Sequence, residues 1–508
     1  MATRKEQVDA FSFARRRMVS NMVAPTATGS DEFAPRPVRT FLTSFMIGAV
    51  AIAAVVVLGV FRPSAPSGWQ GGLDVDSASG ADYIYSPQDH ELHQVYNTTS
   101  AKLLLGNTFQ VFTVPDSVIN GPNESIGAAY GILGAPPDVP GASNVNLTQW
   151  NACEQSASLT NQTAAEGKTV LEVGYGFGSL NPMPKDSYLL VHNASGTMYM
   201  IDGNYAYPVA DDNTATVLAG QTVSSNQERG PFVPDSWLNA FEHGDPIRVP
   251  TVPDAGDPVP AALTRQPGHE IGDYGTTSTS DFIETENGLV EVNAFAYNLY
   301  KAAPPAGAQQ MTVTAGSPAV QNATVDIGNT STLISGPSTT WPQPAQSVVD
   351  DTLGQDGSFA VVCAGFTGSI NANGVPQLSL YTGSNLPHPL SADGGIAQSV
   401  QTQSQLANLM DVESGHAAIF QVAAAEATKG TGTEFLLPST GIRYPLAPKE
   451  TFTQLSGKQV SASAAQMLGY DKLAAEGVPA SFAALVTTGQ TLDPIAAGQT
   501  PPLTGTGQ

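Results

Sequence analysis

The stretch closest to a nucleotide-binding motif is QTAAEGKT, residues Gln162–Thr169. Gly167, Lys168 and Thr169 are the residue types with which a phosphate-binding loop holds nucleotide phosphates and Mg²⁺. A glutamine stands where the first loop glycine belongs, and the following VLEV is typical of a strand. A phosphate cradle needs both the glycine-rich loop and a helix N-terminus. We therefore interpret this stretch as a surface turn and predict no nucleotide-binding residue in it.

Other chemistries have equally weak signals. A second glycine-rich run, Gly174–Gly178, precedes SLNPMPKDS, which has no helical pattern, so we expect a flexible loop. His90 and His93 fall in and beside a hairpin turn with no third ligand, and we interpret them as surface histidines. The pairs Asp211–Asp212 and Asp350–Asp351 flank turns and are expected to be solvated. Since His-Glu-x-x-His and Gly-x-Ser-x-Gly are also absent, no catalytic residue or metal site is predicted.

The elements that would position any site begin with a recurring hairpin pattern. Two short apolar strands joined by a polar turn are predicted at residues 81–95, 187–201, 280–292 and 433–446. Gly196, Gly288 and Gly441 fall in three of the turns, as a hairpin with a left-handed residue requires. The spacing of the copies is irregular, which excludes a tight solenoid.

Capped helices are predicted after three of these hairpins, at residues 97–106, 212–220 and 448–457, each stopped by a glycine, namely Gly106, Gly220 and Gly457. The third hairpin lacks a clear helix. Strand patterns at 310–316, 323–328, 358–366 and 376–383 predict a central β-region over about 310–384. A short helix is expected around Trp237–Phe241, an extended run at Ile247–Pro253 and a helix at Ile396–Val412.

Phe41–Phe61 is the one long apolar segment, with 21 residues and no charge. As a helix it would cross roughly 30 Å, the thickness of the hydrocarbon core of a bilayer. Residues 1–40 contain seven basic and four acidic residues, which predicts a cytoplasmic N-terminus. The predicted organisation is a cytoplasmic helix and linker at 1–40, a single span at 41–61, an outer domain at 62–486 with modules near 73–110, 187–222, 276–300 and 431–486, and a disordered tail at 487–508.

The cytoplasmic segment is predicted to be helical over residues 4–23 because its apolar residues recur at steps of three to four. The helix could lie on anionic lipid headgroups, or its apolar stripe could dock on a cytoplasmic partner. Sequence alone does not separate these alternatives. The predicted interaction residues are Phe11, Arg15, Arg16, Arg17, Met18 and Met22.

Two cysteines, Cys153 and Cys363, follow the predicted span and so lie on its outer side. An even count in an oxidising compartment favours one disulfide, and two buried free thiols are the alternative. The bridge would close a loop of about 210 residues and contribute on the order of 5 kcal/mol in the chain-entropy model.

Composition limits the class of protein. Charged residues make up only 13% of the chain, with 50 glycines and 38 prolines, which favours many short strands and turns. The net charge of −24 argues against nucleic acid as a partner and against an anionic lipid surface for the outer domain. The predicted fold class is therefore α+β, mainly β.

The chain resembles the EccB family of actinobacterial type VII (ESX) secretion machines. The resemblance runs in order through nearly all of residues 4–486. It is carried by DAFSFARRRMVSNMV before the span, YNTTSAKLLLG after the first hairpin, IRVPTVPDAG after the second module, the two outer cysteines and the GIRYPL–helix–MLGY ending.

The resemblance implies an outer domain of four hairpin–helix repeats around a central β-domain, similar to a distorted propeller, with a disulfide. It also implies a place in an inner-membrane complex with EccC, EccD and EccE. The outer domains would assemble in the periplasm, where a mycosin protease docks.

Three functions are compatible with these expectations. The first is a structural and assembly subunit of the secretion complex. The second is an outer-domain nucleotide hydrolase, because some EccB relatives are described as ATPases. The third is a membrane-anchored domain that binds at the cell surface. No cofactor is predicted, and ATP remains open.

Overall fold

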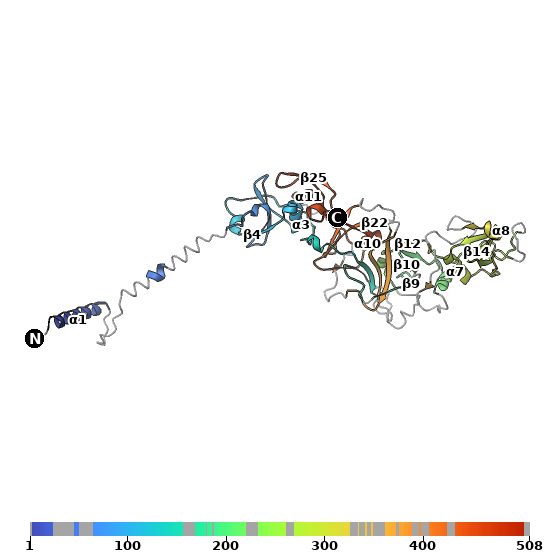
Figure 1. Cartoon of the computed structure of the whole chain (residues 1–508), viewed down its shortest axis with the longest axis horizontal. Helices are drawn as coiled ribbons and strands as arrows, with labels where there is room; N and C mark the ends of the chain where they lie inside the picture. Colours follow the sequence, from blue (N-terminus) through green and yellow to red (C-terminus); the bar gives the residue numbers. More distant parts are fainter. Residues whose placement is uncertain are drawn as a thin grey trace. The chain divides into compact units, whose positions relative to one another are not determined.

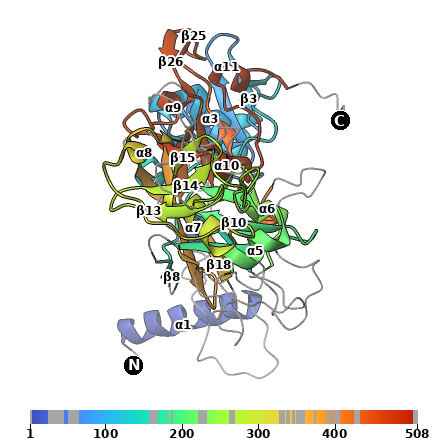
Figure 2. The same cartoon turned by 90° about the vertical axis from the view of Figure 1, so that its right-hand side faces the viewer.

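The chain divides into two compact units, Met1–Ala65 and Pro66–Gln508, which Figures 1 and 2 show in two views of a computed structural model. The structure describes residues 3–23, 45–49, 64–155, 168–178, 180–184, 187–219, 232–260, 269–325, 334, 341–342, 347–348, 361–371, 375–388, 396–397, 406–423 and 432–501.

The first unit contains the predicted cytoplasmic helix, α1 (Arg4–Val23). Of the predicted span Phe41–Phe61, only residues 45–49 are described, and they are helical. The rest of that prediction lies outside the described residues. Within the described part of the chain, no helix combines the length and apolarity needed to cross a membrane.

A seven-stranded sheet forms the centre of the second unit, in the order β20-β21-β7-β6-β18-β19-β8. Its strands are β20 (Ile396–Ala397), β21 (Leu409–Val412), β7 (Lys168–Val173), β6 (Trp150–Gln155), β18 (Val361–Ile370), β19 (Pro376–Gly383) and β8 (Asn181–Pro182). β6, β7 and the first half of β18 are buried at almost every position, as expected for strands covered on both faces.

The four predicted hairpins are all present, each in a separate sheet. The first sheet, in the order β4-β1-β2-β3-β5, contains β1 (Leu73–Asp76), β2 (Asp82–Ser86), β3 (Glu91–Gln94), β4 (Val111–Val114) and β5 (Ser125–Ile126). The second, β12-β11-β10-β9-β17, contains β9 (Ser187–His192), β10 (Met198–Asp202), β11 (Tyr205–Pro208), β12 (Glu242–His243) and β17 (Ser347–Val348).

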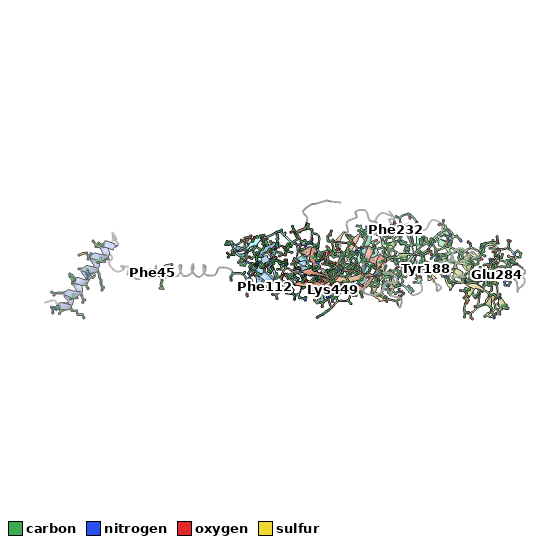
Figure 3. All side chains as sticks on the ribbon, turned by 90° about the horizontal axis from the view of Figure 1, so that it is seen from above. Phe45, Phe112, Tyr188, Phe232, Glu284 and Lys449 are labelled. Carbon is green, nitrogen blue, oxygen red and sulfur yellow. A yellow bond between two sulfur atoms is a disulfide. The ribbon has the colours of Figure 1, made fainter. Side chains whose placement is uncertain are left out.

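The third sheet, β13-β14-β15-β16, contains β13 (Tyr274–Thr276), β14 (Asp281–Thr285), β15 (Gly288–Val292) and β16 (Thr324–Val325). The fourth, β24-β23-β22-β27, contains β22 (Ala417–Ala423), β23 (Glu434–Pro438), β24 (Tyr444–Pro445) and β27 (Glu476–Pro479). Phe112 on β4 and Glu284 on β14 mark the first and third sheets in Figure 3. Gly196 and Gly441 have φ values of 80° and 73°, which supply the left-handed turn residue that the sequence predicts.

The structure confirms the helices predicted after the first and second hairpins. After the third and fourth hairpins it differs from the prediction. α3 (Thr98–Leu105) and α5 (Asp212–Leu218) begin at Asn97 and Asp211, whose side chains accept backbone N–H bonds. Asp211 therefore caps a helix rather than being only solvated. The third hairpin does have a helix, α7 (Ala294–Ala302), capped by Asn293. Its buried residues Phe295, Ala296, Leu299 and Tyr300 follow helical spacing, a signal that the sequence prediction missed.

The helix predicted at 448–457 is instead a strand and a turn. β25 (Glu450–Thr453) pairs with β26 (Gln459–Ala462) across a turn that contains Gly457. Thr451, Phe452 and Thr453 are residues that favour strands, and they outweigh the helix-like ending. The helix of this region comes later, as α9 (Ala464–Met467), with a capping box between Ser463 and Gln466.

Three further predictions are corrected by the structure. Of the helix expected at Ile396–Val412, residues 398–405 lie outside the described part, and its two ends are the strands β20 and β21. Met410 and Val412 alternate with more exposed neighbours and pair with β7. Gln310 and β16 (Thr324–Val325) pair within the third sheet, not the central one, and α8 (Pro318–Gln321) lies between them. The tail predicted to be disordered is folded over residues 487–501, where Leu492 pairs with Leu446 and both Leu492 and Ala497 are fully buried.

The remaining short helices connect these sheets. They are α4 (Asp116–Ile119), α6 (Asp235–Leu238), α8 (Pro318–Gln321), α10 (Ala480–Ala484), α11 (Pro494–Ala497) and the 3-10 turns η1 (Trp69–Gly71), η2 (Gly106–Thr108) and η3 (Ala142–Asn144). α6 falls close to the helix expected at Trp237–Phe241, and Ile247 begins the predicted extended run with a single bridge to Val209.

Two large hydrophobic cores hold the second unit together. One lies on the face of the central sheet that carries Trp150 and includes Trp237, Phe420 and Phe482. The other joins the first and fourth hairpin sheets, because side chains from α3, β23 and α9 pack together in it. The mainly β, mixed character is thus confirmed, whereas the propeller arrangement of repeats stays a prediction.

Candidate functional site

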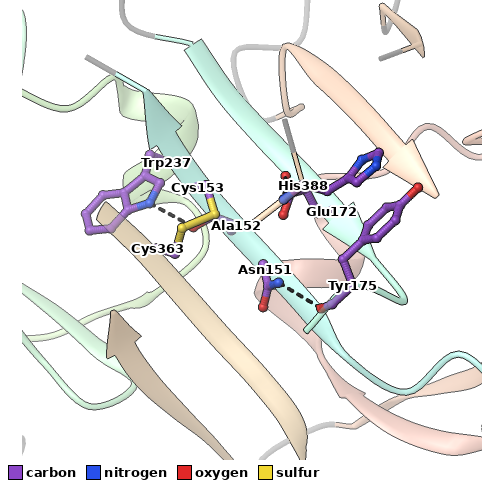
Figure 4. Close-up of a disulfide and its surroundings, with 8 residues drawn as sticks. All are labelled: Asn151, Ala152, Cys153, Glu172, Tyr175, Trp237, Cys363 and His388. Atoms are coloured by element: carbon purple, nitrogen blue, oxygen red, sulfur yellow. Dashed lines mark hydrogen bonds between the residues drawn. A yellow bond between two sulfur atoms is a disulfide. The ribbon is translucent and has the colours of Figure 1, made fainter. Parts of the chain in front are cut away.

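The two cysteines meet at the centre of the sheet. β6 and β18 are antiparallel neighbours, and Cys153 lies directly opposite Cys363 in their register. The structure joins them in a disulfide with a Cα–Cα distance of 4.0 Å, and neither residue has any exposed surface (Figure 4). On the other face, the indole N–H of Trp237 donates to the carbonyl of Ala152 at 3.0 Å and so ties α6 to β6. The predicted bridge is therefore present and fully enclosed.

A row of polar residues crosses the sheet on the same face as the disulfide. Asp411 on β21, Glu172 on β7 and Asn151 on β6 are neighbours in register, and Gly365 on β18 continues the row. Asn151 shares a face with Cys153 because alternate residues of a strand point the same way. Asn151 and Glu172 have no exposed surface. The buried carboxyl group of Glu172 is thus placed beside the disulfide.

Two loops cover this row. The loop after β7 stacks the ring of Tyr175 on His388, with centroids 4.1 Å apart. His388 Nδ1 lies 2.8 Å from Asp411 Oδ2, and the Tyr175 hydroxyl donates to Asp411 Oδ1 at 3.3 Å. The amide of Asn151 also donates to the carbonyl of Tyr175 at 3.1 Å (Figure 4). We call Asn151, Glu172, Tyr175, His388 and Asp411 the polar cluster.

Burial determines the electrostatics of the polar cluster. Removal from water has the largest effect on Glu172, whose pKa is raised to about 8. The backbone N–H of His388 donates to Glu172 Oε1 at 3.2 Å and lowers this pKa, whereas the nearby charge of Asp411 raises it. Glu172 is therefore expected to hold a proton at neutral pH. Burial, followed by Asp411, raises the pKa of the Tyr175 hydroxyl to about 12. The cluster can retain a proton and fasten two loops to the sheet.

Gly365 makes a close approach possible next to this cluster. A Cβ at this position would meet the ring of Phe177, which stacks on Tyr381, and would lie 2.9 Å from the Tyr381 ring. We expect Gly365→Ala to displace the stacked pair and to lower the free energy of unfolding by about 1–3 kcal/mol. Gly176→Ala is the matched control, because its nearest neighbour would be 3.6 Å away. Equal urea midpoints for the two variants would contradict the role of Gly365.

The weak nucleotide-binding candidate is part of the sheet. Gly167 lies outside the described residues, and Lys168 and Thr169 begin β7. The Thr169 hydroxyl lies 2.6 Å from the hydroxyl of Ser236, and its N–H donates to Asn408 at 2.8 Å. These groups of Thr169 thus join β7 to Ser236 on α6 and to Asn408, and Lys168 and Thr169 lie on a strand, not at a helix N-terminus. The run Gly174–Gly178 is the loop that covers the polar cluster.

The interpretation of His93 as a surface residue is wrong. Its side chain is buried and stacks on Tyr130 with centroids 3.9 Å apart. Nδ1 contacts the carbonyl of Ala128 at 2.7 Å and Nε2 contacts Asp89 at 3.0 Å. Ligand atoms of Asp89, Glu91 and His93 lie within 4.8 Å of one another, but both ring nitrogens already have protein partners.

His90, by contrast, is exposed in the hairpin turn, as predicted. The acidic pair Asp350–Asp351 lies outside the described residues.

The predicted interaction residues of the first unit are displayed on α1. The side chains of Phe11, Met18 and Met22 are 72%, 72% and 89% exposed. Residues 11, 15, 18 and 22 follow one another at steps of four and three, so Arg15 lies on the same face as these three. Arg16 and Arg17 point to other sides of the helix, turned from Arg15 by about 100° and 200°. The helix thus presents an exposed apolar stripe that contains one basic residue, Arg15.

Sequence reasoning missed the whole polar cluster. The one local signal was Glu172 within the apolar VLEV run, because a charged residue in a buried strand needs a special environment. Tyr175, His388 and Asp411 come from loops and a strand that are distant in sequence, and no local pattern connects them.

Comparisons with known proteins agree with this fold. The chain matches the family model described as type VII secretion system ESX-1, transport TM domain B, over residues 1–501. It is 24% identical over 402 residues to the ESX-1 secretion system ATPase EccB1 of Mycolicibacterium smegmatis strain MKD8, which covers 78% of each chain. It is 23% identical over 482 residues to the ESX-3 secretion system ATPase EccB3 of Mycobacterium tuberculosis H37Rv, which covers 90% of this chain and 83% of the relative.

Two solved structures share the fold. A chain in the structure of an intact ESX-5 inner membrane complex matches with a TM-score of 0.60 and 18% identity, covering 100% of this chain and 98% of that chain. A chain in the structure of an EccB3 dimer from the ESX-3 core complex matches with a TM-score of 0.58 and 19% identity, covering 84% and 99%. Because the family model matches residues 1–501 of the 508, this protein belongs to the EccB family of type VII secretion components.

Proposed function

We propose that this chain is a structural and assembly subunit of a type VII secretion complex in the inner membrane. The observation that carries the proposal is the match of the family model over residues 1–501. The fold of a chain from an intact ESX-5 inner membrane complex also covers the whole of this chain. The subunit would contribute to export as a scaffold, since the polar cluster fastens two loops to the central sheet.

The proposed topology places residues 1–40 in the cytoplasm, a single span at 41–61 and the second unit in the periplasm. The excess of basic residues before Phe41 supports this orientation. The disulfide Cys153–Cys363 also supports it, because such bridges persist in oxidising compartments. The net charge of −24 suits neither nucleic acid nor an anionic lipid surface as a partner of the periplasmic unit.

The proposed partners are EccC, EccD and EccE in the membrane complex, with a mycosin protease on the periplasmic side. Self-association of the periplasmic unit is proposed from the EccB3 dimer that one similar structure contains. On the cytoplasmic side, the exposed stripe of α1 would dock on a partner, since exposed apolar residues that flank Arg15 fit an apolar groove with an acidic residue in it.

Mild-detergent extraction of the C-terminally tagged chain tests the proposal. Recovery in a megadalton particle that contains EccC, EccD and EccE, identified by mass spectrometry, is the expected result. Recovery as a lone monomer or homodimer would overturn the scaffold function and favour a binding domain at the cell surface.

Substitutions on α1 test the docking stripe. We expect Phe11→Ala, or reversal of Arg15, Arg16 and Arg17 to glutamate, to reduce recovery of EccC, EccD and EccE about tenfold. Phe13→Ala is the matched control, because Phe13 is 59% exposed and lies on the opposite side of the same helix. Equal recovery from Phe11→Ala and Phe13→Ala would show that the stripe does not bind a partner.

The names of the curated relatives carry a second candidate function, ATP hydrolysis. ATP turnover by the purified full-length protein in lipid nanodiscs would support this second function. The activity should be retained after the other members of the complex are removed. Lys168→Ala would then test the weak candidate at β7, where the neighbouring Thr169 already serves the sheet.

A further inference from the structure

Three residues of metal-ligating type meet beside the turn of the first hairpin. Asp89 lies in the turn between β2 and β3, and Glu91 and His93 follow it on β3. Glu91 and His93 share a face of β3 because alternate residues of a strand point the same way. One ligand atom from each of the three residues lies within 4.8 Å of the other two. Two carboxylates and an imidazole therefore converge.

The surroundings of His93 determine which ring nitrogen can face a ligand. The residue is 3% exposed, and its ring stacks on Tyr130. Nδ1 lies 2.7 Å from the carbonyl of Ala128, which can only accept a hydrogen bond, so Nδ1 carries the proton of this contact. A histidine anchored in this way on a backbone carbonyl presents the lone pair of its other nitrogen, Nε2, which is the usual arrangement of metal-bound histidines.

The Nε2 atom lies against a negative oxygen. It is 3.0 Å from Asp89 Oδ2, and both atoms are acceptors once Nδ1 holds the proton of the ring. Two acceptors repel each other unless a cation lies between them, either a second proton on the ring or a metal ion. Two ligand atoms on a tetrahedral zinc ion, each about 2.0–2.1 Å from the metal, are about 3.4 Å apart. The contact between His93 and Asp89 thus has nearly the spacing of two ligands on one ion.

Neighbouring groups hold both carboxylates close to the histidine. The hydroxyl of Ser125 on β5 donates to Glu91 Oε1 at 3.1 Å, and the backbone N–H of Glu91 donates to Asp89 Oδ1 at 3.2 Å. Gly127 makes room for Glu91 Oε2, because a Cβ at residue 127 would overlap this oxygen and the ring of His93. One oxygen of each carboxylate is thus held by the protein, and Asp89 Oδ2 and Glu91 Oε2 face the histidine.

The charge of this part of the chain favours a cation. Residues 63–139 contain eight carboxylate side chains and a single lysine, Lys102. Lys102 pairs with Asp138 at 2.6 Å, and among the described residues the ion-pair partner of Asp89 is His93 itself. The two carboxylates at the turn therefore lie in a strongly negative part of the chain, which attracts a divalent cation.

We propose that Asp89, Glu91 and His93 bind one divalent metal ion. Zinc is the ion best suited to one imidazole and two carboxylates in tetrahedral geometry, with water as the fourth ligand. The ion would fasten the turn of the β2–β3 hairpin to β5, because Glu91 pairs with Ser125 in the register of these strands. This metal site goes beyond the proposed scaffold function and does not depend on it.

Zinc titration of the full-length chain tests the site. The protein is purified in detergent through a tag without histidine and treated with EDTA, and zinc is then added in competition with a chromophoric chelator. We expect one saturable zinc site per chain. His93→Gln and Asp89→Asn should each weaken zinc binding at least tenfold, because each removes one ligand. His90→Gln is the matched control and should bind zinc like the natural chain, since His90 is exposed in the same turn and is not one of the three ligands.

Thermal unfolding gives a second readout, which is needed if His93→Gln unfolds the first sheet. The side chain of Asp89 is 42% exposed, so Asp89→Asn is expected to keep the fold. Zinc should raise the thermal midpoint of the natural chain and of His90→Gln, because an ion that binds only the folded state stabilises it. Zinc should leave the midpoint of Asp89→Asn unchanged.

Two results would overturn the metal site. One is the absence of a saturable zinc site in the natural chain, in which case a proton, not a metal ion, lies between His93 Nε2 and Asp89. The other is equal zinc affinity of the natural chain and Asp89→Asn, which would place the bound zinc elsewhere on the protein.

Discussion

The protein is expected to lose stability as the pH rises from about 5.5 to about 8. Three buried carboxyl groups, Asp74, Glu172 and Glu284, give rise to this expectation. Burial, followed by the charge of Glu124, raises the pKa of Asp74 to about 8. The pKa of Glu172 is raised to about 8, and burial followed by Asp273 raises that of Glu284 to about 7.

The sign follows from the difference between the folded and unfolded states. An unfolded carboxyl group has a pKa near 4, so in all three cases the folded protein binds the proton more tightly. The stabilisation from each proton is fully present below about pH 4 and is lost as the pH rises through the folded pKa of about 7 to 8. Each group contributes a slope of up to about 1.4 kcal/mol per pH unit to the free energy of unfolding.

Other carboxyl groups oppose this trend only at lower pH. Hydrogen bonds from the Ser79 hydroxyl and the Ala78 N–H lower the pKa of Asp76. The stability contributed by such a group is lost only as the pH falls through its lowered pKa, which lies in the acid range. Between about pH 5.5 and about pH 8 the buried acids therefore decide the direction.

Scanning calorimetry of the full-length protein across this pH range measures the effect. Glu172→Gln keeps the shape of the side chain and removes its ionisation, so it should flatten the pH profile and raise the midpoint at about pH 8. Glu450→Gln, on the exposed strand β25, is the control and should leave the slope unchanged. A midpoint that rises from about pH 5.5 to about pH 8 would contradict the assignment of neutral, buried acids.

The parts of the fold that sequence predicts well are those with local signals. Each hairpin combines alternating apolar residues with a turn that needs a left-handed residue, and Gly196 and Gly441 satisfy that need. Asn97 and Asp211 mark the starts of α3 and α5 because a side chain that accepts a backbone N–H bond is a local requirement.

The parts that sequence predicts badly depend on distant partners. Leu409–Val412 has apolar spacing that suits a helix, but its environment beside β7 makes it a strand. Leu492 has the sequence context of a disordered tail, and only its pairing with Leu446 and its burial in the second core make it part of the fold. The polar cluster is the extreme case, because Glu172 and Asp411 are neighbours only through the parallel pairing of β7 with β21.

Loss of the disulfide is expected to destabilise the protein by about 2–5 kcal/mol. The bridge joins residues 210 positions apart, and the chain between them includes the second and third hairpin sheets. In the unfolded state this long loop is closed only by the bridge, so its removal increases the entropy of the unfolded chain. The double substitution Cys153→Ala and Cys363→Ala should lower the urea midpoint accordingly.

Reductant separates the cross-link from the packing of the sulfur atoms. Both cysteines are fully buried, so dithiothreitol should leave the folded protein oxidised and act only once urea opens the central sheet. Unfolding of the natural chain in reductant should then approach the midpoint of the double variant, while the double variant should not respond to reductant. Reductant could leave the urea midpoint of the natural chain unchanged while the double variant still has a lower midpoint. The lost stability of the double variant would then come from the cavity left by the sulfur atoms. The tether between β6 and β18 would then contribute little, and the second hairpin sheet would depend for its attachment to the central sheet on the core around Trp237 and on contacts such as the bond from the Leu378 N–H to Asn204.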